Sequence, residues 1–126
     1  MAVTHTTTFR NIVADLVGSG CNAGKLVFRI TGSSANGVAS AVASLTMSAT
    51  AFGAAASGTA TANTITANTS AAGGVAAFAT FEGAAATVMA HVAVAPSGSD
   101  IDFSNGVTVT AGDTVSCSSL SYTARP

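Results

Sequence analysis

Charged side chains are scarce in this chain. Aspartate, glutamate, lysine and arginine make up only 7% of its 126 residues, and the formal net charge is -1. An ordinary soluble domain has roughly a quarter of its residues charged, because charges keep it hydrated and apart from its neighbours. A surface of Ala, Thr, Ser and Gly has few charges to desolvate when another subunit covers it. The composition therefore favours a component of a larger assembly.

The low cation content also excludes several functions. Four lysines and arginines are scattered along the chain without a basic run, so direct binding of nucleic acid is not expected. No stretch approaches the ~20 apolar residues that a membrane-spanning helix needs. The first residues lack the basic start and apolar run of a secretory signal. We therefore expect cytoplasmic synthesis and no membrane association.

Tryptophan is absent and aromatic residues make up 6% of the chain. The core must therefore come from Val, Ile, Leu, Met and a few Phe, and the length predicts a single domain over residues 1–126. The two cysteines, Cys21 and Cys117, lie far apart and outside any CxxC pattern. A disulfide is possible by number, but a reducing compartment favours two free, buried thiols.

The opening segment carries a helical pattern. Five apolar residues follow the period of a helix: Phe9, Ile12, Val13, Leu16 and Val17. The hydroxyl of Thr7 or Thr8 can cap the start, and the glycines of residues 18–20 can end the helix. We expect one short helix over residues 7–18, with an apolar stripe that packs on the domain's own sheet or on a neighbouring subunit.

After the helix, the apolar period changes to two. Alternating runs recur with turn signals between them, at residues 25–31, 40–48, 59–67, 75–81, 88–94, 101–109 and 114–123. In the last run the parity changes, which a bulge between Ser118 and Ser119 would reconcile. This spacing predicts an all-β fold, an antiparallel β-sandwich or jelly roll, with the short N-terminal helix added.

Two alanine-rich stretches allow more than one interpretation. Residues 84–95 could form a helix, since Ala is the best helix former, but the alternating β-branched residues favour a strand. Residues 49–72 contain almost no bulky side chains. This stretch is a mobile loop, or an arm or flat strand that docks onto a neighbour, and the Ala-Thr alternation from Thr59 favours the ordered alternative. The predicted interface residues are Phe9, Ile12, Val13, Leu16, Ala51, Phe52 and Ile65.

No residue pattern points to catalysis or to a cofactor. His5 and His91 are isolated, whereas a metal site typically takes three or four ligands. Asp100 and Asp102 share one face of an extended segment, where a Ca²⁺ ion is conceivable. Ala111 stands where an EF-hand would have its bidentate Glu, so a solvated strand followed by an Asn-Gly turn is the better interpretation. We expect no enzyme activity, no metal and no cofactor.

Several short motifs span nearly the whole chain. They are FRNIVAD at 9–15, GKLVF at 24–28, ASLTMS at 43–48, AFG at 51–53, GGVAAF at 73–78, SDIDFS at 99–104, AGDTVS at 111–116 and SLSYTA at 119–124. Together they resemble a group of small virion structural proteins of tailed bacteriophages and prophages. The resemblance implies a head decoration, or cement, protein of jelly-roll type that binds the outside of the capsid.

The same resemblance implies the partners. They are the major capsid protein and further copies of this chain, as a dimer or a trimer, after synthesis in the cytoplasm of the bacterial host. It supplies no catalytic residues. The alternative is a tail, baseplate or head-fibre module that binds a host receptor or glycan, against which the low aromatic content counts. A pilus or surface-layer subunit shares the composition but needs a signal peptide.

Overall fold

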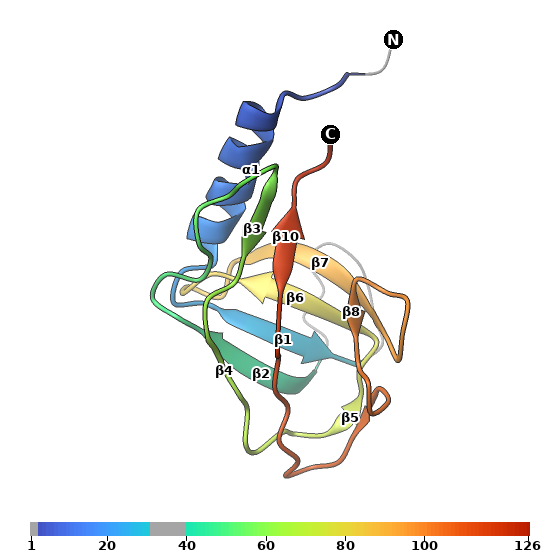
Figure 1. Cartoon of the computed structure of the whole chain (residues 1–126). Coiled ribbons are helices and arrows are strands. Elements are labelled where there is room, and N and C mark those ends of the chain that lie inside the picture. The colour runs from blue at the N-terminus through green and yellow to red at the C-terminus, as the bar shows by residue number, and fades with distance from the viewer. Residues whose placement is uncertain (1–2, 31–39) are drawn as a thin grey trace.

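The computed structural model describes residues 3–30 and 40–126, which form mostly β structure with one helix, α1 (Thr7–Gly20). The strands of this part are β1 (Lys25–Arg29), β2 (Ala41–Met47), β3 (Thr59–Thr61), β4 (Ile65–Thr66), β5 (Gly74–Val75), β6 (Phe78–Glu82), β7 (Val88–Ala95), β8 (Ile101–Asp102), β9 (Thr108–Val109) and β10 (Ser121–Thr123). Six of them form a curled sheet in the order β4-β2-β1-β6-β7-β8, and β10-β3 and β5-β9 form two smaller pairs (Figure 1).

The prediction of a β-rich fold with one short N-terminal helix is confirmed. The prediction of purely antiparallel pairing is wrong, because β8 runs parallel to β7 with Val94 opposite Ile101. The intervening residues 96–100 form a tight loop in which Gly98 has a φ of +71°. This loop returns the chain beside β7, so that both strands run in the same direction.

The core lies on one face of the curled sheet. Strand β1 is central, with Leu26 opposite Leu45 of β2 on one side and Phe81 of β6 on the other. Leu26 and Leu45 are fully buried, and Phe28 and Phe81 are nearly so. The predicted alternation of β1 is therefore confirmed for Leu26 and Phe28. All the buried apolar residues of the described chain except Val27 belong to one cluster, as expected of a single core.

The other face of the same strands carries a buried ion pair. Arg29 Nη2 donates to Glu82 Oε2 at 3.0 Å, and Arg29 Nε donates to Thr80 Oγ1 at 3.3 Å. The Thr80 hydroxyl in turn donates to Glu82 Oε2 at 2.9 Å. Arg29 and Glu82 are only 8% and 6% exposed. Two of the few charged side chains of the chain are thus buried, and the attraction between them compensates the cost of removing each from water.

The helix begins at Thr7, as predicted, but its N-cap differs from the prediction and it continues beyond residue 18. Thr6, not Thr7 or Thr8, is the N-cap, because its hydroxyl accepts a hydrogen bond from the Phe9 amide at 3.2 Å. The helix also continues through Gly18 to Gly20. Gly18 does not end it, because its missing side chain makes room for Phe52: a Cβ there would lie 3.0 Å from the Phe52 Cβ.

Four of the predicted runs are interrupted: 59–67, 75–81, 101–109 and 114–123. The run 75–81 divides into β5 and β6, which belong to different sheets. Directly before this run, Gly73 and Gly74 have positive φ angles of +87° and +132°. As a result Val75 is 51% exposed and Ala76 is buried, the reverse of the predicted parity there. By contrast, the alanine-rich run at 88–94 forms β7, as predicted.

The last predicted strand is also shorter than expected. Val115 forms an isolated bridge with Asn68, and regular pairing resumes only in β10. The residues between them form no strand, so the predicted bulge between Ser118 and Ser119 is wrong. The turn at Asn105 and Gly106 exists, but it joins strands of different sheets and makes no hairpin. Thr31 and the predicted turn at 32–37 lie outside the described residues.

The stretch 49–72 is neither a mobile loop nor a projecting arm. Ala51, Phe52, Ala60 and Ala71 are all buried in the core, and the stretch contributes β3 and β4. Its small side chains let the backbone approach the sheet and α1 closely, which larger residues would prevent. The low complexity of this stretch therefore reflects close packing.

The buried ion pair gives a first prediction. Glu82→Leu removes the carboxylate that neutralises Arg29 in a buried site, so the free energy of unfolding is expected to fall by about 3–5 kcal/mol. The double variant Arg29→Met with Glu82→Leu removes both charges and is expected to recover most of the loss. Urea unfolding followed by circular dichroism measures both values. If the double variant is as unstable as Glu82→Leu, the unpaired Arg29 charge is not the cause of the lost stability.

Candidate functional site

Helix α1 is held to the body of the molecule by its polar face (Figure 1). Three hydrogen bonds join helix side chains to the backbone of the body: Arg10 Nε to the Ala124 carbonyl (3.0 Å), the Gly58 amide to Asn11 Oδ1 (2.7 Å) and the Ala55 amide to Asp15 Oδ1 (2.7 Å). Arg10 and Ala14 are four residues apart, as are Asn11 and Asp15, so these positions fall on one side of the helix. Ala14, fully buried, lies between them.

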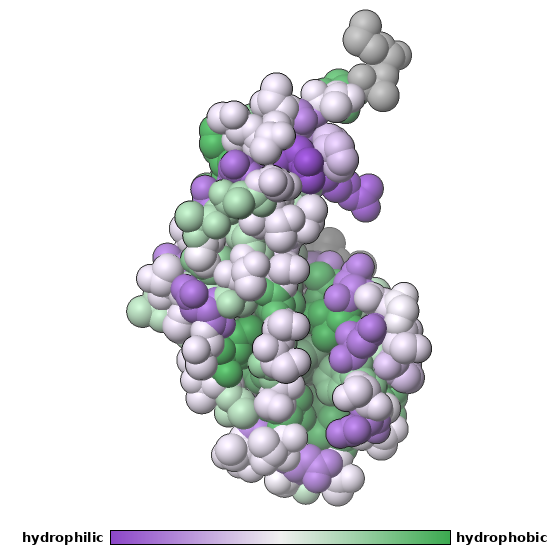
Figure 2. Space-filling model, in the orientation of Figure 1, coloured by the Kyte–Doolittle hydropathy of each residue, from purple (hydrophilic) through white to green (hydrophobic). Residues whose placement is uncertain are grey.

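The apolar side of α1 consequently faces away from the body. We name Phe9, Ile12 and Leu16 the helix stripe. They are 46%, 58% and 70% exposed, while Val13 and Val17 at the edge are partly buried. Apolar atoms are visible on the outer edge of α1 in Figure 2. A surface helix normally turns such a stripe toward its own core, so the reversed orientation leaves an apolar surface exposed.

The predicted interface residues thus separate into three groups. Phe9, Ile12 and Leu16 are exposed in the single chain, and Val13 borders them. Ile65 is partly buried on β4, the first strand of the curled sheet. Ala51 and Phe52 are only 1% and 6% exposed, so they offer no surface to a partner in this fold. Phe52, one of two bulky side chains in the stretch 49–72 together with Ile65, could have been recognised as a core residue from the sequence.

A groove of about 830 Å³ opens on the same side of the molecule as β10. Figure 2 shows apolar residues at its bottom and polar residues along its rim. One wall is the segment 100–106 around β8, and the other runs along residues 113–121. Its floor contains Phe28 and Phe103, whose rings meet edge to face with centroids 4.8 Å apart. Such a volume with an apolar floor is typical of ligand sites.

The second wall includes an irregular segment without strand partners. We name residues 116–119 the C-terminal ridge. Val115 before it exchanges two backbone hydrogen bonds with Asn68, and the Leu120 carbonyl after it accepts one from Ala62. Within the described chain, no backbone hydrogen bond joins the ridge itself to another segment. A smaller hollow of about 310 Å³ lies along Cys117–Leu120 as well, so the ridge separates two depressions.

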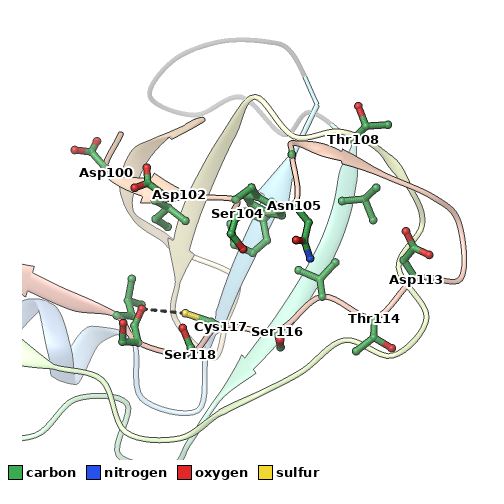
Figure 3. A pocket seen from close by; sticks show the side chains of 18 of the residues that line it. Asp100, Asp102, Ser104, Asn105, Thr108, Asp113, Thr114, Ser116, Cys117 and Ser118 are labelled. Carbon is green, nitrogen blue, oxygen red and sulfur yellow. Dashed lines mark hydrogen bonds between the residues drawn. The ribbon is translucent and has the colours of Figure 1, made fainter. Parts of the chain in front are cut away.

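Three carboxylates line the groove: Asp100, Asp102 and Asp113 (Figure 3). They are three of only five acidic residues in the chain, and no lysine or arginine is among the lining residues. One oxygen of each carboxylate accepts a hydrogen bond from a backbone amide. The Ala93 amide donates to Asp100 at 3.1 Å, the Ser99 amide to Asp102 at 2.9 Å and the Thr110 amide to Asp113 at 2.9 Å. These bonds hold the side chains, Asp100 and Asp102 on the β8 wall and Asp113 on the opposite wall, so the groove carries negative charge on both sides.

The sequence pattern indicated only part of this patch. Asp100 and Asp102 were predicted to share a face, and both line the groove. Asp113 comes to the same groove through the fold, and no local signal in the sequence could place it there. Among residues 3–30 and 40–126, no three His, Cys, Asp or Glu side chains are grouped so that they could hold a metal ion.

The remaining reactive side chains lie in structural surroundings. The rings of His5 and Phe9 are 4.8 Å apart, and those of His91 and Phe78 are 5.8 Å apart. Both cysteines are free. Cys21 is fully buried and Cys117 is partly buried on the C-terminal ridge, and burial raises the pKa of both thiols above their ordinary 9.0.

The comparisons with known proteins leave the family open. Neither a protein-family model nor a curated protein nor a solved structure matches this chain. In the described part of the chain, no helix is sufficiently long and apolar to cross a bilayer.

The two thiols are expected to differ in reactivity. Cys117 lines the groove and should react with iodoacetamide first, whereas Cys21 should react only when the protein unfolds. Because burial raises the pKa of Cys117 above 9.0, little thiolate is present at neutral pH. Its alkylation rate should therefore continue to rise through pH 9.0. Intact-mass spectrometry over time measures the rates, with Cys117→Ser as the control. A rate that levels off below pH 8, or simultaneous labelling of Cys21, would contradict this assignment.

Proposed function

We propose that this protein is a non-enzymatic structural subunit of a bacteriophage virion: a decoration protein that forms a homo-oligomer and binds the major capsid protein outside the head. The observation that carries the proposal is the helix stripe. Phe9, Ile12 and Leu16 point away from the body, although their burial would each contribute about 1.5–3 kcal/mol. A partner that covers the stripe gains this apolar area.

The partner that suits the stripe is a second copy of the same helix. The residues are spaced three and four apart, which is the spacing of a coiled-coil seam, in which side chains of one helix fit between those of another. The stripe contains no charged side chain, so two copies can meet without burying an ion. Around a twofold or threefold axis, the same surface then serves every protomer.

The contact between two helix stripes is too small to hold the oligomer together without further contacts to the capsid. A 14-residue helix is about 21 Å long, so its stripe gives only a few hundred Å² per protomer. A standard stable interface buries roughly 800 Å² per partner. The oligomer therefore depends on additional contacts, which a capsid lattice supplies in many copies so that weak interfaces act together.

Composition and resemblance support the virion assignment. A surface with 7% charged residues is suited to contacts on several sides. The motifs distributed from residue 9 to residue 124 resemble those of phage virion proteins. The finer fold class, a jelly-roll or sandwich, belongs to this proposal. What supports it is a core enclosed between the curled sheet and the segments that carry α1, β3 and β10.

The second candidate is a tail, baseplate or head-fibre module that binds a host receptor or glycan. The groove beside β8 favours it, because a ligand site is what such a module would need. The two functions predict different positions on the particle. Electron microscopy of the phage that encodes this chain, with an affinity label at residue 126, would show the label over the head surface or on the tail.

Leu16→Asp tests the helix stripe. It places a charge in the contact at the most exposed residue of the stripe, so self-association should weaken by about a hundredfold or more, as for a hot-spot residue. The fold should be unaffected, because Leu16 is 70% exposed. Sedimentation velocity over a range of concentrations measures the oligomer, and thermal melting measures the fold.

Thr7→Asp is the matched control. It adds the same charge to the same helix, at an exposed position in the first turn outside the stripe, where a negative charge favours the helix dipole. This variant should associate like the parent protein. A parent protein that stays monomeric at every concentration, or two variants that behave alike, would overturn the role of the stripe.

A further inference from the structure

The groove is bordered by the free edge of β8 on one side and by the irregular C-terminal ridge on the other. Strand β8 is the last strand of the curled sheet, so only one of its edges is paired, with β7. Across the groove, the C-terminal ridge makes no backbone hydrogen bond to another described segment. Backbone amides and carbonyls on both walls are thus available, and unpaired strand edges are the surfaces to which proteins add a further strand.

The space between the edges fits an extended peptide. The β8 wall runs over residues 100–106 and the ridge over residues 116–119, and a strand rises about 3.3 Å per residue, so roughly four to six residues would follow the groove. Alternate side chains of such a strand point to opposite faces. One set would pack on the floor of Phe28, Phe103 and Val115, and the other would point outward to the rim.

The charge of the rim determines which peptide is suited. Asp100, Asp102 and Asp113 are fixed around the groove, and no cation is among its lining residues. The β8 edge of a second copy would bring the same acidic residues and be repelled. A peptide with Lys or Arg at its outward positions meets opposite charges instead, which strengthens binding and speeds association.

We propose that this groove binds an extended polypeptide segment of alternating apolar and basic residues, by strand addition between β8 and the C-terminal ridge. The inference goes beyond the virion role and does not depend on it, because it uses neither the helix stripe nor the oligomer. It assigns Asp100, Asp102 and Asp113 to partner recognition, in addition to the backbone-amide hydrogen bonds that they accept.

The probe is a capped hexapeptide that alternates lysine and valine, measured by isothermal titration calorimetry. Binding should weaken as salt is added, because the rim pairs are exposed to solvent. Asp102→Asn and Asp113→Asn should each weaken binding about twofold to fivefold, as exposed ion pairs do. Asp15→Asn is the matched control: it removes a carboxylate on α1, outside the groove, and should leave the affinity unchanged.

Two further peptides separate strand pairing from charge. The same hexapeptide with N-methylated valines keeps its charge but loses backbone hydrogen-bond donors. Its affinity should therefore fall by roughly tenfold or more. A hexapeptide that alternates glutamate and valine should not bind. Occupancy of the groove should also slow alkylation of Cys117, which is among the lining residues.

Several results would overturn the proposal. These are equal binding of the N-methylated or the glutamate peptide, unchanged affinity in both aspartate variants, or no binding of the lysine peptide at all. Protection of Cys117 by a neutral oligosaccharide but not by the lysine peptide would assign the groove to glycans instead. Leu16→Asp should keep full peptide affinity, so a failure of the oligomer and a failure of the groove are distinguishable.

Discussion

A hydrogen bond between the two ends of the chain supports both surfaces described above. Arg10 on α1 donates to the carbonyl of Ala124, directly after β10. Gly58 lies against the same guanidinium, with no room for a side chain, since a Cβ there would lie 2.7 Å from the Arg10 Cζ. The bond therefore orients α1 with its polar side inward and also anchors the segment that carries the C-terminal ridge. The helix stripe and one wall of the groove depend on the same contact.

The scarcity of charge gives each ionic group a definite place. Arg29 and Glu82 neutralise each other inside the fold, and Arg10 and Asp15 attach the helix. Three of the five acidic residues line the groove. The helix stripe has no charged side chain. A charge-poor surface thus does not lack electrostatic character; its negative charge is concentrated where a ligand can meet it.

The helix and several strands were predictable because their signals are local. The 3–4 spacing of Phe9, Ile12 and Leu16 and the alternation in β1 and β7 follow from the period of each element. Which side of the helix faces the body was not predictable. An apolar stripe normally turns inward, and here three polar side chains with backbone partners on distant segments reverse the orientation.

The sequence by itself determined the β-rich class, the single short helix, the low charge and the exclusion of a basic surface, because composition and short-range periodicity express these properties directly. Only the tertiary structure decided that Ala51 and Phe52 lie in the core, that β8 runs parallel to β7, and that Asp113 joins Asp100 and Asp102 at one groove. These features depend on contacts between residues far apart in the chain. Small Ala, Gly, Ser and Thr side chains permit many such approaches, and the packing of the few large residues selects among them.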